Sequence, residues 1–165
     1  MFRSVAKKGG VKVKIVVRSV GKTKDKRLKQ LSEEYLKRSN HYLSVVAEEV
    51  REGSGRIEEI KAQEAANLTQ GISPDSILIS MDERGEEMTS EAFSKFIETH
   101  MIHGTRYIYF MIGGAAGLDP ELMEQSQKRL SLSKMTLPHE MARTILFEQI
   151  YRAFTIIRGE PYHKD

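Results

Sequence analysis

The sequence predicts an α/β protein built on a parallel-type sheet with helices on both faces. Short apolar or β-branched segments alternate strictly with longer segments of helical periodicity. Strict alternation of this kind aligns the strands in one direction and lays the connecting helices across both faces of the sheet. The chain of 165 residues contains no internal repeat, linker or low-complexity tract. We therefore expect one domain over residues 11–165.

The first half of the chain predicts three strands and two helices. Residues 11–17 (VKVKIVV) alternate and then become fully apolar, which is typical of a strand. Residues 24–38 repeat leucine and tyrosine at helical spacing, so an amphipathic helix should follow. The later patterns predict a strand at 42–50, a polar helix at 57–70 and a buried strand at 76–81.

The second half begins with a polar segment, residues 82–88, which we expect to form a loop. A helix capped by Thr89 or Ser90 should follow it. Asp119 before Pro120 marks another helix start, because an acid suits the N-cap and proline suits the first helical position. The other elements predicted are a strand at 106–112, a glycine turn at 113–117, a strand at 129–133, a loop at 134–138 and a helix at 139–157 that ends at Gly159.

Composition limits the classes of protein to consider. The chain is 39% hydrophobic and 30% charged, which is ordinary for a globular protein. It has no apolar run near the roughly 20 residues that a membrane span needs, and no cysteine for a disulfide or thiolate site. We expect a cytoplasmic protein without membrane contact. Residues 1–10 lack the apolar core of a secretory signal, so we expect a disordered N-terminal arm or a tag.

Charge and motifs narrow the choice of ligand. The net charge of +3, with basic ends around an acidic middle, is compatible with a nucleic-acid partner. Gly21-Lys22-Thr23 resembles half of a nucleotide-binding P-loop, but the residue five positions earlier is Val16 instead of glycine. The glycines at 113, 114 and 117 do not match the dinucleotide pattern either. The histidines show no metal-binding spacing, so no metal site is expected.

Three loops are the candidate ligand site. In open α/β sheets the ligand binds beyond the carboxyl ends of the strands, and the loops at 82–88, 113–119 and 134–138 all follow predicted strands. The last of these enters a helix through Pro138. Free backbone N–H groups at such a helix start can receive an acceptor-rich ligand.

Four ordered blocks of the chain resemble one known family. They are IGGAAGL at 112–118, LSLSKMTLPH at 130–139, EQIYR at 148–152 and PYHK at 161–164. They resemble the RlmH family, the ribosomal large-subunit pseudouridine N3-methyltransferases of the SPOUT superfamily. The resemblance implies a C-terminal trefoil knot, a homodimer, S-adenosylmethionine as methyl donor without a metal, and 23S ribosomal RNA, within the assembled ribosome, as substrate.

The resemblance also implies which residues hold the donor. Met81 occupies the position of an apolar residue against the donor, and Gly113 matches a glycine whose backbone lies close to it. The segment that wraps the adenine and methionine parts comprises Leu132, Ser133, Lys134, Met135, Thr136 and Leu137. These positions fall on or beside the three loops that the strand-end rule selects.

Methylation of N3 requires loss of its proton, and four residues are candidates for this chemistry. His139 and Arg143 share one helix face. We favour Arg143 as a binder of phosphate or of the anionic base, with a structural ion pair as the alternative; His139 is equally a base or a helix-start residue. Tyr162 and His163 lie on a tail that, by the resemblance, completes the partner subunit's pocket.

Other residues receive secondary roles. Arg152 follows Glu148 by four positions, which favours an intrahelical pair before an RNA contact. RNA contacts are expected from Lys22, Lys134, Arg143, Arg158 and Lys164. Two alternatives remain open: another SPOUT methyltransferase, acting on transfer RNA or a different ribosomal base, and a non-catalytic ribosome-binding factor.

Overall fold

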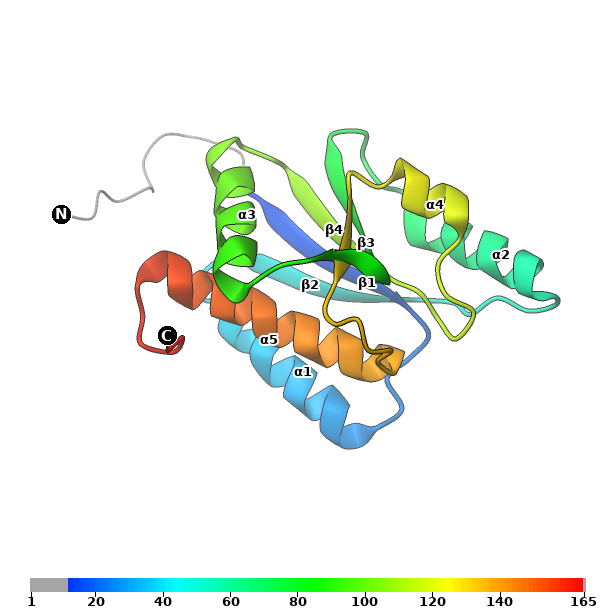
Figure 1. The fold of residues 1–165 in the computed structure, drawn as a ribbon, viewed down its shortest axis with the longest axis horizontal. Coiled ribbons are helices and arrows are strands. Elements are labelled where there is room, and N and C mark those ends of the chain that lie inside the picture. The colour runs from blue at the N-terminus through cyan, green and yellow to red at the C-terminus, as the bar shows by residue number, and fades with distance from the viewer. Residues whose placement is uncertain (1–11, 165) are drawn as a thin grey trace.

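A computed structural model describes residues 12–164 of the chain, and Figure 1 shows a twisted central sheet covered by helices. The five strands are all parallel and lie in the order β2-β1-β4-β3-β5. The predicted α/β class with a parallel sheet is confirmed. The elements are β1 (Lys14–Val20), α1 (Lys26–Ser39), β2 (Ser44–Val50), α2 (Ile57–Thr69), β3 (Ser76–Glu87), α3 (Ser90–Ile102), β4 (Tyr107–Ile112), α4 (Pro120–Gln125), β5 (Lys128–Ser131) and α5 (His139–Arg158).

The helices cover both faces of the sheet, and each face has its own apolar core. Helices α1 and α3 both pack on α5 and cover one face, whereas α2 and α4 lie on the other (Figure 1). Ile15 and Val17 of β1 point into the core under α5. Val20 and Met111 join the core under α2 and α4. Because side chains alternate along a strand, one strand supplies both cores.

Local sequence signals determine where several helices begin and end. The carboxylate of Asp119 accepts the N–H groups of Glu121 and Leu122 at 2.9 and 3.3 Å, with Pro120 at the start of α4 as predicted. Thr89, rather than Ser90, is the N-cap of α3. Gly159 ends α5 with a φ of 67°, a left-handed conformation that glycine adopts without steric cost.

The structure corrects the predicted loop at 82–88. Strand β3 continues to Glu87, with an irregularity after Met81, so that Leu130 pairs with both Met81 and Glu86. The polar sequence has no strand pattern of its own. The strand forms here because the chain pairs with β5, which lies more than forty residues later. Strand β5 itself ends at Ser131, two residues before the predicted end.

Smaller differences concern the other ends. Strand β2 begins at Ser44 instead of Tyr42, because the N–H groups of Tyr42 and Leu43 both donate to the carbonyl of Ser39 in a turn after α1. The expected N-terminal arm, residues 1–10, lies outside the described residues. Within residues 12–164, no helix is long and apolar enough to cross a membrane.

Candidate functional site

The predicted ligand loops meet around one cavity of about 450 Å³ at the carboxyl edge of the sheet. Seven of the eight residues expected to hold the donor line it; these are Met81, Gly113, Leu132, Ser133, Met135, Thr136 and Leu137. Lys134 does not line the cavity, and its ammonium lies 3.6 Å from the carboxylate of Glu87. His139 also lines the cavity, so the structure brings one catalytic candidate to the donor residues.

The glycine loop after β4 forms one wall of the cavity with its backbone. A Cβ on Gly113 would lie 2.9 Å from the carbonyl carbon of Gly117, so no larger residue fits that turn. Gly117 has a φ of 79°, and its N–H donates to the carbonyl of Gly114 at 3.0 Å. The glycines therefore have a reason internal to the turn, and they also leave the backbone open to the cavity.

The second half of β3 also lines the cavity, through Asp82, Glu83 and Arg84. The hydroxyl of Thr136 donates to the carboxylate of Glu83 at 2.5 Å, which ties the loop after β5 to this strand. Burial alone would raise the pKa of Asp82, but hydrogen bonds from Arg84 outweigh it and hold that pKa below its usual value. The cavity therefore carries an ionised carboxylate.

Sequence reasoning missed several lining residues. It selected the loop at 82–88 without singling out Asp82, Glu83 and Arg84, which line the cavity. Ala142 lines it as well, one turn into α5. Its four-residue spacing from Pro138 was the available signal, because residues four apart share a helix face.

The start of α5 also lines the cavity, through Pro138, His139 and Ala142. Pro138 is the N-cap and supplies no side-chain hydrogen bond to the helix. The neighbouring Glu140 points elsewhere, because its carboxylate accepts the N–H groups of Lys24 and Asp25 at 2.9 and 3.1 Å. These two hydrogen bonds lower the pKa of Glu140. Among these residues, His139 is the titratable group that faces the cavity.

Arg143 lies away from the cavity, in a buried position. Its side chain is 4% exposed, and its guanidinium donates to the hydroxyl of Thr23 at 2.6 Å and to the carboxylate of Glu49 at 3.1 Å. It also donates to the carbonyl oxygens of Val20 and Gly21 at 3.4 and 3.1 Å. This placement favours the structural ion pair over the substrate-binding role that we preferred from the sequence.

Tyr162 lies in the tail after α5 and packs against the second half of that helix. Its hydroxyl donates to the carboxylate of Glu148 at 3.0 Å, and its ring contacts the ring of Tyr151 with centroids 4.8 Å apart. The guanidinium of Arg152 lies 4.7 Å from the centre of the same ring. Burial, with hydrogen bonds to Tyr35 and Glu148, raises the pKa of Tyr162 well above its ordinary value. The phenol is therefore neutral here.

His163 joins the same network. Its Nδ1 lies 3.2 Å from Nη1 of Arg152, and its Nε2 lies 2.7 Å from the carboxylate of Glu91 on α3. Arginine has only donors, so Nδ1 must accept and Nε2–H must donate to the carboxylate. The hydrogen bond with His163 lowers the pKa of Glu91 to about 2. The expected Arg152–Glu148 intrahelical pair is present at 2.5 Å.

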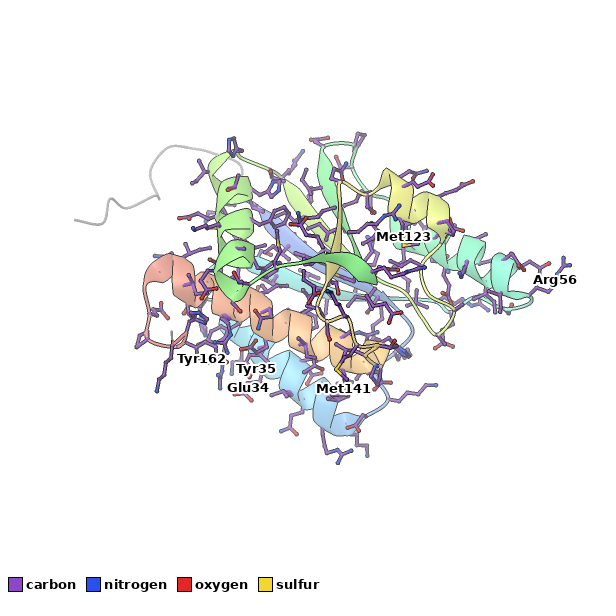
Figure 2. All side chains as sticks on the ribbon, in the orientation of Figure 1. Glu34, Tyr35, Arg56, Met123, Met141 and Tyr162 are labelled. Carbon is purple, nitrogen blue, oxygen red and sulfur yellow. The ribbon has the colours of Figure 1, made fainter. Side chains whose placement is uncertain are left out.

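One copy of the chain does not bring all the candidates together. Tyr162 reaches Glu148, which lies nine residues after His139 on α5. At 1.5 Å per residue, Glu148 lies about 13 Å from His139 along the helix. Figure 2 shows Tyr162 and Met141 at opposite ends of α5. Of the expected RNA-contacting residues, Lys22, Lys134, Arg158 and Lys164 are exposed, and Arg143 is buried.

Known proteins resemble this chain over nearly its whole length. A family profile described as predicted SPOUT methyltransferase matches residues 13–163. The chain is 41% identical over 159 residues to the ribosomal RNA large subunit methyltransferase H of Ruminiclostridium cellulolyticum, covering 92% of this chain and all of that protein. It is 41% identical over 157 residues to the protein of the same name from Porphyromonas gingivalis, covering 93% of this chain and all of that protein.

A solved structure has the same fold at low sequence identity. A probable methylase family protein of Haemophilus influenzae aligns with a TM-score of 0.50 and 13% identity, over 93% of this chain and 70% of that one. This likeness concerns the fold alone. The profile and the relatives together show that the chain belongs to the SPOUT methyltransferase family, in the group of the ribosomal RNA large subunit methyltransferases H.

Proposed function

We propose that this chain transfers the methyl group of S-adenosylmethionine to N3 of a pseudouridine in 23S, large-subunit ribosomal RNA. The observation that carries the proposal is the single cavity in which Met81, Gly113 and the 132–137 loop meet. The relatives that cover the chain are named ribosomal RNA large subunit methyltransferase H. Seven of the eight residues chosen as donor contacts from the sequence thus line one cavity in the fold.

The cavity fits a donor of this size and chemistry. About 450 Å³ lies within the range of about 300–1,000 Å³ that is common for small-molecule sites. Leu118, Leu130 and Leu132 offer apolar surface for an adenine ring, and the glycine loop and the start of α5 offer backbone polar groups. The bound donor supplies an electrophilic methyl group on a sulfonium, which needs no metal for transfer. Among residues 12–164 no group of acidic and histidine side chains could hold a metal ion.

The residues of the chain must position the base and accept its N3 proton. His139 is the cavity residue whose imidazole can take that proton. The start of α5 lies beside it, and the positive end of the helix dipole stabilises the negative charge that develops on the base. Arg143 supports this arrangement indirectly, by fixing the turn after β1 against α5.

We propose that the active unit is a homodimer. Within one chain, Tyr162 contacts Glu148, about 13 Å along α5 from His139, and His163 contacts Arg152, about 20 Å along it. Both can therefore reach a donor site most directly from a second copy. In that role Tyr162 acts as a hydrogen-bond donor, because its raised pKa keeps the phenol neutral.

We also propose that the chain carries the C-terminal trefoil knot of the SPOUT fold. In support, the irregular part of β3 after Met81 lies closely beside its parallel neighbour β5: a Cβ on Gly85 would lie 2.8 Å from the backbone of Arg129. The substrate is the assembled ribosome in the cytoplasm, and the exposed Lys22, Lys134, Arg158 and Lys164 contact its phosphates.

Donor binding and methyl transfer test the proposal directly. Calorimetric titration with S-adenosylmethionine should release heat, and tritiated donor should label 23S RNA in intact ribosomes at one pseudouridine. Ala142→Phe, which fills the cavity, should abolish both signals, whereas the same change at the exposed Ala62 of α2 should abolish neither. Binding without label in ribosomes, subunits or free RNA would make the chain a binding factor; label in transfer RNA alone would refute the substrate.

Mixing two inactive variants tests the homodimer. Ala142→Phe blocks the donor cavity, and Tyr162→Phe removes the tail hydroxyl but keeps its ring. If one subunit's tail completes the other's cavity, co-refolded variants should regain about a quarter of wild-type activity, because half of the random dimers have one intact site in two. No recovery would contradict the shared site.

A further inference from the structure

Glu64 on α2 is a buried acid that the proposed chemistry does not use. The residue is 5% exposed and lies on the sheet face opposite α5. Its Oε1 accepts the N–H of Gly53 at 3.1 Å. Its Oε2 has no hydrogen-bond partner among the described residues, and none of the ion pairs found within residues 12–164 includes Glu64.

This carboxylate lies directly behind the glycine loop of the donor cavity. A Cβ built on Gly114 would lie 3.4 Å from both carboxylate oxygens of Glu64 and 3.1 Å from a methyl of Val20. Gly114 also lines the cavity. The amide nitrogen of Gly114 is two covalent bonds from that Cβ position. The carboxylate and the cavity are therefore on either side of one stretch of backbone.

Burial of the Glu64 Oε2 atom is energetically unfavourable unless this oxygen accepts a hydrogen bond. A buried polar group without a partner costs free energy, and the cost is larger for a charged group. Most buried polar groups in native proteins have a hydrogen-bond partner in the protein or in ordered water. Gly114 is close to this oxygen, since a Cβ there would lie 3.4 Å from it. The N–H groups of the glycine loop are therefore candidate partners, and they belong to the segment that lines the cavity proposed to hold S-adenosylmethionine.

We propose that Glu64 is a positioning residue for the donor loop: its free Oε2 accepts an N–H of the segment 113–117 when S-adenosylmethionine occupies the cavity. The carboxylate then joins the loop after β2, through Gly53, to the loop after β4, through Gly114 or Ala115. Closing this hydrogen bond favours the donor-bound form of the loop. The inference rests on the proposed function, because the ligand is the methyl donor.

Glu64→Gln is the most direct test. Glutamine has the same shape and keeps an oxygen for Gly53, but its second position carries N–H donors that cannot accept from the loop. We expect the Kd for S-adenosylmethionine to rise about tenfold, or ~1.4 kcal/mol. The KM for the donor should rise in parallel, with kcat at saturating donor unchanged. Glu58→Gln, an exposed site on the same helix, should bind as the wild type does.

A purely structural role for Glu64 predicts different effects on stability and on donor binding. If Glu64 serves only the fold, Glu64→Gln lowers the unfolding midpoint of the ligand-free protein and leaves the Kd unchanged. We expect the opposite, because removing a buried unpaired charge should not destabilise the ligand-free form. A wild type that binds no donor overturns the proposed function and this inference with it. A wild type that binds, with Glu64→Gln equal to it, overturns this inference alone.

Gly114→Ala supplies a second, independent variant. Its methyl group would lie between the loop and the carboxylate, at the 3.4 Å separation from both oxygens. It should weaken donor binding, and Glu64→Gln in the same chain should add less than it does alone, because both changes break one contact. Strict additivity of the two effects on the Kd would refute the contact.

Discussion

Replacement of Arg143 by methionine separates the two roles that this residue can have. Methionine keeps the unbranched stem and fills most of the space, but it removes every donor of the guanidinium. In the structure these donors bind Thr23, Glu49 and two carbonyl oxygens of the turn after β1. The change therefore removes one hydrogen-bond partner each from the Thr23 hydroxyl, two carbonyl groups and the Glu49 carboxylate, which keeps only the N–H of Thr23.

The size of the effect follows from burial. Removal of one partner from a buried ion pair costs about 3–5 kcal/mol. The arginine side chain is 4% exposed but that of Glu49 is 39% exposed, so water can solvate the remaining carboxylate. We therefore expect the lower end, about 3 kcal/mol. For a chain of this size, about 2–4 °C per kcal/mol gives a decrease in Tm of roughly 6–12 °C.

Thermal and urea unfolding of Arg143→Met measure this loss, and methyl transfer at a temperature where the variant is folded measures its activity. Arg51→Met, at an exposed arginine after β2, is the matched control and should keep the wild-type Tm. We expect a large decrease in stability with kcat within a few-fold of the wild type. A variant with wild-type stability and no activity would refute the ion-pair role and restore Arg143 as a substrate-binding residue.

Three further changes probe the scaffold around the site. Asp119→Ala removes the N-cap of α4 and should cost about 1 kcal/mol in urea unfolding, whereas an unchanged midpoint would deny the cap a role. Gly85→Ala places a Cβ 2.8 Å from the backbone of Arg129 and should cost about 1–3 kcal/mol by overpacking; a wild-type unfolding curve would contradict this close approach of β3 to β5. The hydrogen bond with His163 lowers the pKa of Glu91 from 4.5 to about 2, so its stabilisation is present above pH 4.5 and is lost as the pH falls towards 2. Glu91→Gln should flatten the dependence of Tm on pH in that window, and an unaltered profile would show that the contact is not formed in solution.

Local patterns in the sequence were sufficient for most of the elements. Alternation of apolar residues predicts β1 and β4, and the Asp119-Pro120 pair predicts the start of α4, because each depends on residues close in the chain. The second half of β3 was not predicted. Residues 82–87 are polar and partly exposed, and their strand geometry comes from pairing with β5. A strand defined by a distant partner leaves little periodicity of its own.

The candidate site, like the fold, could be predicted from the sequence only in part. The strand-end rule selected three loops, and the structure places them around one cavity, because carboxyl ends of parallel strands meet at one edge of a sheet. It could not select Ala142 or distinguish a buried arginine from a substrate-facing one. Arg143 and His139 share a helix face by spacing, yet only His139 lines the cavity. Four-residue spacing shows that two residues share a helix face. What each of them contacts depends on how the turn after β1 packs against α5.

The amino-acid sequence by itself determined the α/β class, the order of elements, the loops at 113–119 and 134–138 and the family, because these depend on local periodicity, capping residues and motif order. The tertiary structure alone decided which side chains face the cavity, that both Nη groups of Arg143 donate to the turn after β1 and to Glu49, and that Glu64 lies behind the glycine loop. These features depend on contacts between residues 50 to 120 positions apart, and such contacts arise from the packing of whole elements, which no short stretch of sequence encodes.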